Sequence, residues 1–420
     1  MTAAEDVRPG TDRLRAAVER RVPGRALERP FYTDPEFHAL DIAAIFARQW
    51  LFVAPEAEIP EPGDYLTLEI GPYPLIVLRD ADSTLRAFHN VCRHRGSRLL
   101  DAERGSARNL VCAYHRWTYG TDGRLRHAPS QPADADPGRL GLRPVHVRAV
   151  GGLLFVCLAD EPAPGFDEIA ARVEPYLLPH DLRHARVAAR ADLVEHGNWK
   201  LVMENNRECY HCDGHPELLR TFFPTYGHTE ETLPPHLRPA HERYLRADAE
   251  LRATYERLGL PYALIEELEA RPVGFRIQRD ALDLAGESFT PDGRAASRRT
   301  LGDLPTRRLG HLALHLQPSS WFHVVADHAI TFSVRPLAPD RTLLRTTWLV
   351  HPEAVEGVDY DLDTLRAVWT ATNEQDARFV ARAQRGVSSP AYTPGPYAPT
   401  EYQVEAFCAW YIARLREVLG

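Results

Sequence analysis

The sequence predicts an α+β protein: a small all-β domain near the N-terminus, followed by a larger domain in which an antiparallel sheet carries helices. A chain of 420 residues is long for a single hydrophobic core. Residues 45–160 hold short β runs such as DYLTLEI and PLIVLRD, separated by turn residues. Residues 222–308 are expected to form helices and loops, and strand-like runs return at residues 311–351. We therefore expect a helical segment at 1–44 that packs on the second domain, a β domain at 45–160 and the second domain at 161–420.

Composition narrows the function classes. The chain is 44% hydrophobic and 26% charged, which is typical of a globular protein, and its formal net charge is −8. A negative balance without Lys/Arg runs argues against nucleic-acid partners. No apolar run is long enough to span a membrane, and the first residues lack the apolar core of a signal peptide. Six cysteines in this length do not form a disulfide framework, so we expect a cytoplasmic protein whose Cys and His clusters bind metal.

Two Cys/His pairs inside the β domain predict a first metal site. Cys92 and His94 follow one strand-like run, and Cys112 and His115 follow another, which places the pairs on neighbouring loops. Two thiolates and two imidazoles fit either Zn²⁺ or a [2Fe–2S] centre with two histidines on one iron. The spacing C-x-H…C-x-x-H, with one Cys and one His from each loop, is the Rieske pattern. Trp117 is well placed to shield such a cluster from water.

The stretch 198–219 predicts a second metal site. Glu204, Glu208, His211 and His215 follow one another at spacings of four, three and four residues, which places them on one face of a helix. The preceding residues have the apolar spacing of a core helix, and buried ionisable groups there are costly unless paired or bound to metal. Two imidazoles one turn apart suit a divalent metal. The alternative is a solvated helix face.

A third ligand is predicted on the helix at residues 361–386. Asp376 falls in the middle of the apolar stripe of this helix, where an isolated carboxylate is costly. One interpretation pairs it with Arg378 or Arg382. The other makes it the carboxylate of a 2-His-1-carboxylate triad for non-haem Fe(II). That triad consists of His211, His215 and Asp376.

Together these motifs resemble the Rieske non-haem iron oxygenases of the α-subunit type. The resemblance rests on HNVCRHRGSRL, LVCAYHRWTY, NWKLVMENNRECYHC and NEQDARFVARAQRG, which span nearly the whole chain. Within that family the chain is most similar to the glycine-betaine-type N-demethylating monooxygenases. The resemblance implies a Rieske domain, a helix-grip catalytic domain and a homotrimer in which each cluster faces the neighbouring subunit's iron. It also implies that Glu208 bridges the two centres, and we take Glu204 and Glu208 as the catalytic acidic residues.

The implied activity is O₂-dependent oxidative N-demethylation of a quaternary ammonium compound such as glycine betaine, with release of formaldehyde. No G-x-G-x-x-G follows a strand, so we expect a separate flavin/[2Fe–2S] reductase that uses NAD(P)H. The alternatives are an aromatic-ring hydroxylating dioxygenase or another Rieske N- or O-demethylase. An electron-carrier Rieske protein or a structural zinc protein would leave the second site unexplained.

Aromatic side chains are the candidates for holding a cationic methylammonium group. They are Phe222, Phe223, Tyr226, Trp321 and Phe322, and the alternative for each is a place in the ordinary core.

One feature departs from the family. Three residues separate His211 from His215, where the family usually has four. Four-residue periodicity still keeps both imidazoles on one helix face, so we retain both as ligands. Cys209 and Cys212 form a C-x-x-C pair, which we interpret as incidental because His211 between them is needed as a ligand.

Overall fold

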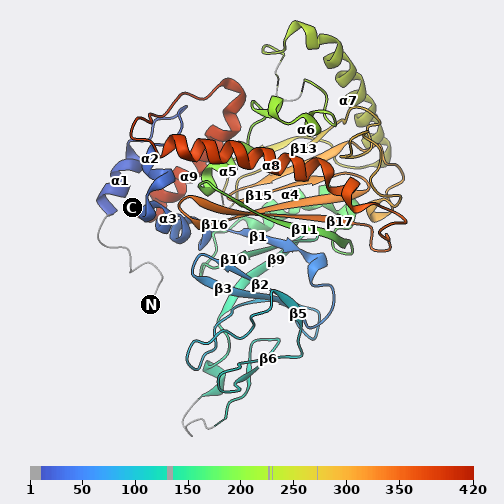
Figure 1. The fold of residues 1–420 in the computed structure, drawn as a ribbon. Helices are drawn as coiled ribbons and strands as arrows, with labels where there is room; N and C mark the ends of the chain where they lie inside the picture. The colour runs from blue at the N-terminus through green and yellow to red at the C-terminus, as the bar shows by residue number, and fades with distance from the viewer. Residues whose placement is uncertain (1–10, 130–135, 226–227, 229, 272) are drawn as a thin grey trace.

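The computed structural model describes residues 11–129, 136–225, 228, 230–271 and 273–420 (Figure 1). Its N-terminal β domain has a seven-stranded antiparallel sheet in the order β1-β10-β9-β4-β3-β2-β5 and a three-stranded sheet in the order β6-β7-β8. The larger sheet consists of β1 (Leu51–Pro55), β2 (Asp64–Ile70), β3 (Tyr73–Arg79), β4 (Leu85–His89), β5 (Arg104–Ser106), β9 (Pro144–Val150) and β10 (Leu153–Cys157). The smaller sheet consists of β6 (Asn109–Val111), β7 (Thr118–Gly120) and β8 (Leu125–His127).

The second domain is built on one antiparallel sheet of seven strands in the order β11-β17-β16-β15-β14-β13-β12. These strands are β11 (Arg186–Glu195), β12 (Ile265–Glu267), β13 (Phe275–Asp280), β14 (His311–Leu316), β15 (Ser320–Val324), β16 (His328–Ala338) and β17 (Arg341–Val350). The α+β class predicted from the sequence is therefore confirmed. The stretch 222–308, in which we expected only helices and loops, supplies the strands β12 and β13 and so extends the sheet.

Helices cover this sheet on both faces. They are α1 (Thr11–Glu19), α2 (Arg29–Thr33), α3 (Pro35–Asp41), α4 (Phe166–Leu177), α5 (Trp199–Asn206), α6 (Pro216–Leu219), α7 (Arg238–Leu258), α8 (Leu362–Val387) and α9 (Tyr402–Leu419). Helix α8 runs across one face beside α5 and α6 (Figure 1). Among the described residues, no helix combines the length and the apolar character needed to cross a membrane.

The alternation of β15 shows how the sheet separates its two faces. Phe322 packs edge-on against Phe52 of β1, with ring centroids 4.7 Å apart, so this face of the sheet lies against the β domain. His323, one residue later, points to the other face and stacks on Trp369 of α8 at 4.2 Å. Successive side chains of a strand point to opposite faces, so a single residue step decides whether a side chain faces the β domain or α8.

A buried ion pair anchors α5 to the N-terminal helices. Lys200 of α5 contacts Asp41 of α3, and both side chains are completely buried. The same carboxylate accepts hydrogen bonds from Trp199 Nε1 (2.8 Å) and the Tyr411 hydroxyl (2.6 Å). Because the Asp41 carboxylate is paired with Lys200 and both of its oxygens accept hydrogen bonds, its burial is tolerated. These contacts fix the position of α5 and therefore of the residues that follow it.

Candidate metal centres and cavity

The first candidate centre lies on two loops that use the same turn. In one loop the Cys92 carbonyl accepts a hydrogen bond from Gly96 N at 3.0 Å, and in the other the Cys112 carbonyl accepts one from Arg116 N at 3.0 Å. Gly96 and Arg116 both have left-handed backbone conformations, with φ of 77° and 60°. Each loop thus folds back four residues after its cysteine and leaves the nearby histidine beside it.

The donor atoms fit a two-iron centre. Cys92 and Cys112 are each only 2% exposed, and both belong to the same buried cluster of the β domain. Burial acts to raise the pKa of Cys112, but backbone N–H groups of Tyr114 and His115 lead the hydrogen bonds that lower it overall. The rings of His94 and His115 lie outside the thiols, with centroids 4.7 Å apart. Paired thiols on the inside and paired imidazoles on the outside match a [2Fe–2S] cluster with two histidines on one iron.

The surroundings of these loops separate a shielded side from an exposed side. Trp117 is buried and stacks on the His94 ring at 4.8 Å, as expected for a shield. Tyr114, by contrast, is 57% exposed beside His115. The loops adjoin β6 at the end of the β domain away from α8 (Figure 1). The histidine side of this centre therefore faces outward, at a distance from the second domain of its own chain.

The second candidate centre lies on irregular backbone. Helix α5 ends at Asn206, a short 3₁₀ turn covers Cys212–Gly214, and His215 has a non-helical backbone with φ −120° and ψ 71°. The predicted continuous helix through His215 is therefore wrong. The Glu208 carboxylate explains the break, because it accepts hydrogen bonds from the backbone N–H groups of Tyr210 and His211 that a helix would use.

The three predicted iron ligands nevertheless meet. Asp376 Oδ1 on α8 lies 2.9 Å from His215 Nε2 and 3.3 Å from His211 Nε2. The two imidazole rings are 5.0 Å apart and nearly perpendicular. Burial acts to raise the pKa of Asp376, but its hydrogen bonds to both histidines lower it overall. The partners of Asp376 are thus the two histidines, not the arginines of α8 that were the alternative.

Glu208 orients the first of these histidines. Its Oε1 lies 2.5 Å from His211 Nδ1, which leaves His211 Nε2 directed at Asp376. Burial acts to lower the pKa of His211, but hydrogen bonds and charges from Asp376 and Glu208 raise it to about 9. A carboxylate on the far nitrogen of a ligating imidazole is the usual second contact of a metal site. The convergence of His211 Nε2, His215 Nε2 and Asp376 Oδ1, together with the Glu208 contact, fits a facial Fe(II) triad.

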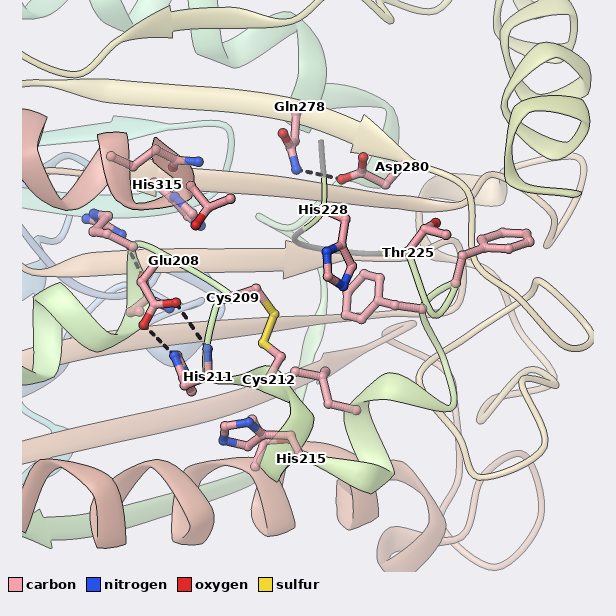
Figure 2. Close-up of a pocket in the computed structure, with 18 of the residues that line it drawn as sticks. Glu208, Cys209, His211, Cys212, His215, Thr225, His228, Gln278, Asp280 and His315 are labelled. Atoms are coloured by element: carbon pink, nitrogen blue, oxygen red, sulfur yellow. Dashed lines mark hydrogen bonds and ion pairs between the residues drawn. A yellow bond between two sulfur atoms is a disulfide. The ribbon is translucent and has the colours of Figure 1, made fainter. Parts of the chain in front are cut away.

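A disulfide joins Cys209 to Cys212, on either side of His211 (Figure 2). Its Cys212 sulfur and the ligand nitrogens of His211 and His215 all lie within 4.8 Å of one another. The interpretation of this C-x-x-C pair as incidental is therefore wrong. With the sulfur engaged, Asp376 is the remaining third ligand.

Glu204 lies elsewhere. The last turn of α5 directs it into the interior, where Oε1 accepts a hydrogen bond from the Tyr32 hydroxyl at 2.9 Å and lies 3.9 Å from Cys408 Sγ. Burial raises its pKa to about 7. Among the described residues that line the cavity beside the histidines, Glu204 is not one. Since the helix ends two residues later, the face shared by Glu204 and Glu208 does not exist, and the prediction of Glu204 as a catalytic residue is wrong.

A cavity of about 370 Å³ opens beside the three convergent side chains. Asp376, His211 and His215 form one wall of this cavity. Figure 2 shows Gln278 and Asp280 on the opposite wall. Aromatic and polar side chains complete the lining, among them Phe222, Phe223, Tyr244, Arg276, His315, His323 and Trp369. A cavity of this size with a few polar groups suits a small polar ligand.

The candidate substrate residues have separate outcomes. Phe222 and Phe223 line the cavity. Trp321 instead stacks on Phe332 at 4.9 Å, and Phe322 faces the β domain, so neither lines the cavity among the described residues. Tyr226 lies outside the described residues.

Sequence reasoning missed the contribution of β13. Its side chains alternate, so that Arg276, Gln278 and Asp280 line the cavity while the residues between them are buried on the other face. Polar residues at every second position of RIQRD were the available signal.

Comparisons with known proteins agree with these two centres. The family described as "Rieske [2Fe-2S] domain" matches residues 49–147, and the family described as "Ring hydroxylating alpha subunit (catalytic domain)" matches residues 182–417. The glycine betaine monooxygenase oxygenase subunit of Chromohalobacter salexigens is 45% identical over 94% of this chain and 86% of its own. The protein of the same name from Pseudomonas aeruginosa is 42% identical over 94% of this chain and 90% of its own. A solved quaternary ammonium Rieske monooxygenase superimposes with a TM-score of 0.68 at 20% identity, covering 97% of this chain and 99% of that one.

The fold and the two centres define an iron-dependent oxygenase with a separate electron-transfer cluster. The chain belongs to the Rieske non-haem iron oxygenases, as a ring-hydroxylating-type α subunit. Its cofactors are accordingly a [2Fe–2S] cluster and a mononuclear iron, and it is the oxygenase component of a system with a separate reductase.

Proposed function

We propose that this protein is the oxygenase component of a glycine betaine monooxygenase. In the net reaction glycine betaine, O₂ and two electrons with two protons give dimethylglycine, formaldehyde and water. The observation that carries the proposal is the 45% identity, over 94% of this chain, to the glycine betaine monooxygenase subunit of Chromohalobacter salexigens. The cavity supports it, because aromatic side chains and a carboxylate face the same space as the three convergent ligands.

The metal ligands follow from the donor atoms. Cys92, His94, Cys112 and His115 would hold the cluster, and His211, His215 and Asp376 would hold the iron. When bound, the iron activates O₂ next to the substrate and the cluster supplies an electron to it. The buried ring of Trp369, which lines the cavity and stacks on His323, helps to exclude water from the reacting methyl group.

Electron transfer requires a neighbouring subunit in this proposal. The cluster loops lie at the end of the chain's own β domain that is away from α8 (Figure 1). A homotrimer would bring the exposed histidine side of one subunit's cluster to another subunit's iron. Glu208, bound to His211 Nδ1 and 12% exposed, would receive a cluster histidine on its free side. A flavin/[2Fe–2S] reductase that uses NAD(P)H would supply the electrons, and a cytoplasmic location stays a prediction.

The test is formaldehyde release from the iron-loaded protein with a surrogate reductase and NADH. Glycine betaine, proline betaine, carnitine and choline are compared, with naphthalene as an aromatic substrate. We expect formaldehyde and dimethylglycine from glycine betaine. Consumption of naphthalene to a diol, with no formaldehyde from any amine, would support the ring-hydroxylating alternative and overturn the proposal.

A further inference from the structure

One strand at the edge of the cavity carries an ordered set of charges. Strand β13 presents Arg276, Gln278 and Asp280 to the cavity, so that a cation, a neutral amide and a carboxylate follow one another. The intervening Ile277 and Arg279 are buried on the other face. Three polar side chains at alternate positions of one strand, all on a cavity wall, indicate recognition of a polar ligand.

The carboxylate of Asp280 is poorly compensated. Its side chain is only 16% exposed, and among the described residues it accepts a hydrogen bond from Gln278 Nε2 at 2.6 Å. Among the described residues, the basic side chain that lies within 4 Å of this carboxylate is His311, whose Nδ1 is 3.9 Å from Asp280 Oδ2. Burial lowers the pKa of His311 to about 3, so this imidazole is neutral. The charge of Arg276, on the same strand, acts to lower the pKa of Asp280, but this guanidinium is itself engaged with Glu266 at 2.6 Å. A buried carboxylate with so little compensation favours a cationic ligand.

Aromatic rings stand beside this carboxylate. The rings of Phe223 and Tyr244 lie 5.5 Å apart, and both line the cavity. Asp280 lines the same cavity, and the pKa of the Tyr244 hydroxyl is raised by burial and also by the charge of Asp280. Phe222 also lines the cavity and meets His311 edge-on at 5.0 Å. Aromatic faces combined with a carboxylate attract a quaternary ammonium group, which has no N–H to donate.

We propose that Asp280 is the counter-ion that binds the trimethylammonium group of the substrate and makes the enzyme select cations. The inference rests on the proposed function and names the residue that reads the charge of its substrate. The trimethylammonium group lies between the Asp280 wall and the wall of His211 and His215, which directs one methyl group to the ligands (Figure 2).

The matched variants are Asp280→Asn and Asp34→Asn. Asp34 precedes α3, is 14% exposed and pairs with Arg13 at 2.6 Å, but it is not among the described residues that line the cavity. Both substitutions remove one negative charge and keep the shape of the side chain. Binding is measured by calorimetry on the metal-loaded protein, without reductase, using glycine betaine and its uncharged-head isostere 3,3-dimethylbutanoate.

Asp280→Asn is expected to weaken the binding of glycine betaine at least about tenfold, as expected for the loss of a buried charge pair. The affinity for the isostere should stay the same or increase. Asp34→Asn should change the affinity for neither ligand by more than about twofold. Equal losses for both ligands, or none, in Asp280→Asn would overturn the role of Asp280. If wild type demethylates glycine betaine in that case, only this inference fails. If wild type neither binds nor demethylates any quaternary ammonium compound, the proposed function fails with it.

Discussion

The two metal centres of this chain are built in opposite ways. The cluster loops are local structures: each folds back through one hydrogen bond to its own cysteine carbonyl, and the two repeat the same turn. The iron ligands instead come from two segments about 160 residues apart and meet only because α8 lies beside the loop after α5. The cluster site is therefore determined by short-range spacing, and the iron site by the packing of the second domain.

The largest expected effect separates the two centres by single substitutions. Asp376→Ala should lower turnover by more than about 100-fold and release the mononuclear iron, because it removes the atom on which both histidines converge. The visible absorbance of the cluster should not change. Cys112→Ser should do the reverse and remove that absorbance while the iron stays bound. Metal analysis and absorbance spectra measure both, and loss of both metals in either variant would contradict the separation.

A second substitution tests whether the iron site depends on the buried scaffold. Lys200→Met leaves the Asp41 carboxylate buried without its cation, which should cost about 3–5 kcal/mol of unfolding free energy. In a urea titration the mononuclear iron should leave before the cluster absorbance fades. Arg13→Met, which removes the pairs of an exposed guanidinium with Asp34 and Glu36, should leave the urea midpoint nearly unchanged. Loss of the iron and the cluster at the same urea concentration would contradict the conclusion that only the iron site depends on the packing of the second domain.

Glu208→Gln addresses the contact between the centres. The amide keeps the shape but loses the charge that faces His211 Nδ1 at 2.5 Å. We expect iron to stay bound and turnover to fall about 10- to 100-fold, the usual cost of a second contact of a metal ligand. Rapid mixing of the reduced protein with O₂ and substrate follows the oxidation of the cluster. An unchanged oxidation rate would exclude Glu208 from electron transfer.

The smallest effect concerns pH. Burial raises the pKa of Asp280 to about 6, and the groups that face it are Arg276, Gln278, Asp248, Tyr244 and His311. The carboxylate is charged above that pH and neutral below it, so affinity for a cationic substrate should be lost as the pH falls through 6. From pH 7.5 to 5.5 the KM for glycine betaine should rise about fourfold, as one titrating group predicts. Asp280→Asn should remove this dependence, and an unchanged slope in that variant would assign it to another group.

The sequence predicted both the residues and the local backbone of the first centre, but only the residues of the second. All four cluster residues and their loops follow from the spacing, because the turn that positions them is local. The three residues proposed as iron ligands do converge, but they were predicted from a continuous helix that does not form, since the Glu208 carboxylate accepts hydrogen bonds from the backbone N–H groups of the next turn.

The errors elsewhere come from long-range structure. The face of a strand cannot be assigned without its neighbours, so Phe322 was placed in the cavity although it packs on Phe52. Asp280 was overlooked because its partners lie on α7 and β14, far away in sequence. Glu204 was assigned to the site because of a helix face that ends at Asn206.

The most direct test of the account is the amount of formaldehyde released per NADH oxidised when the protein, loaded with both metals, turns over glycine betaine. The account predicts one formaldehyde and one dimethylglycine for each NADH, with both absent in Asp376→Ala. NADH and O₂ consumption without formaldehyde would contradict it.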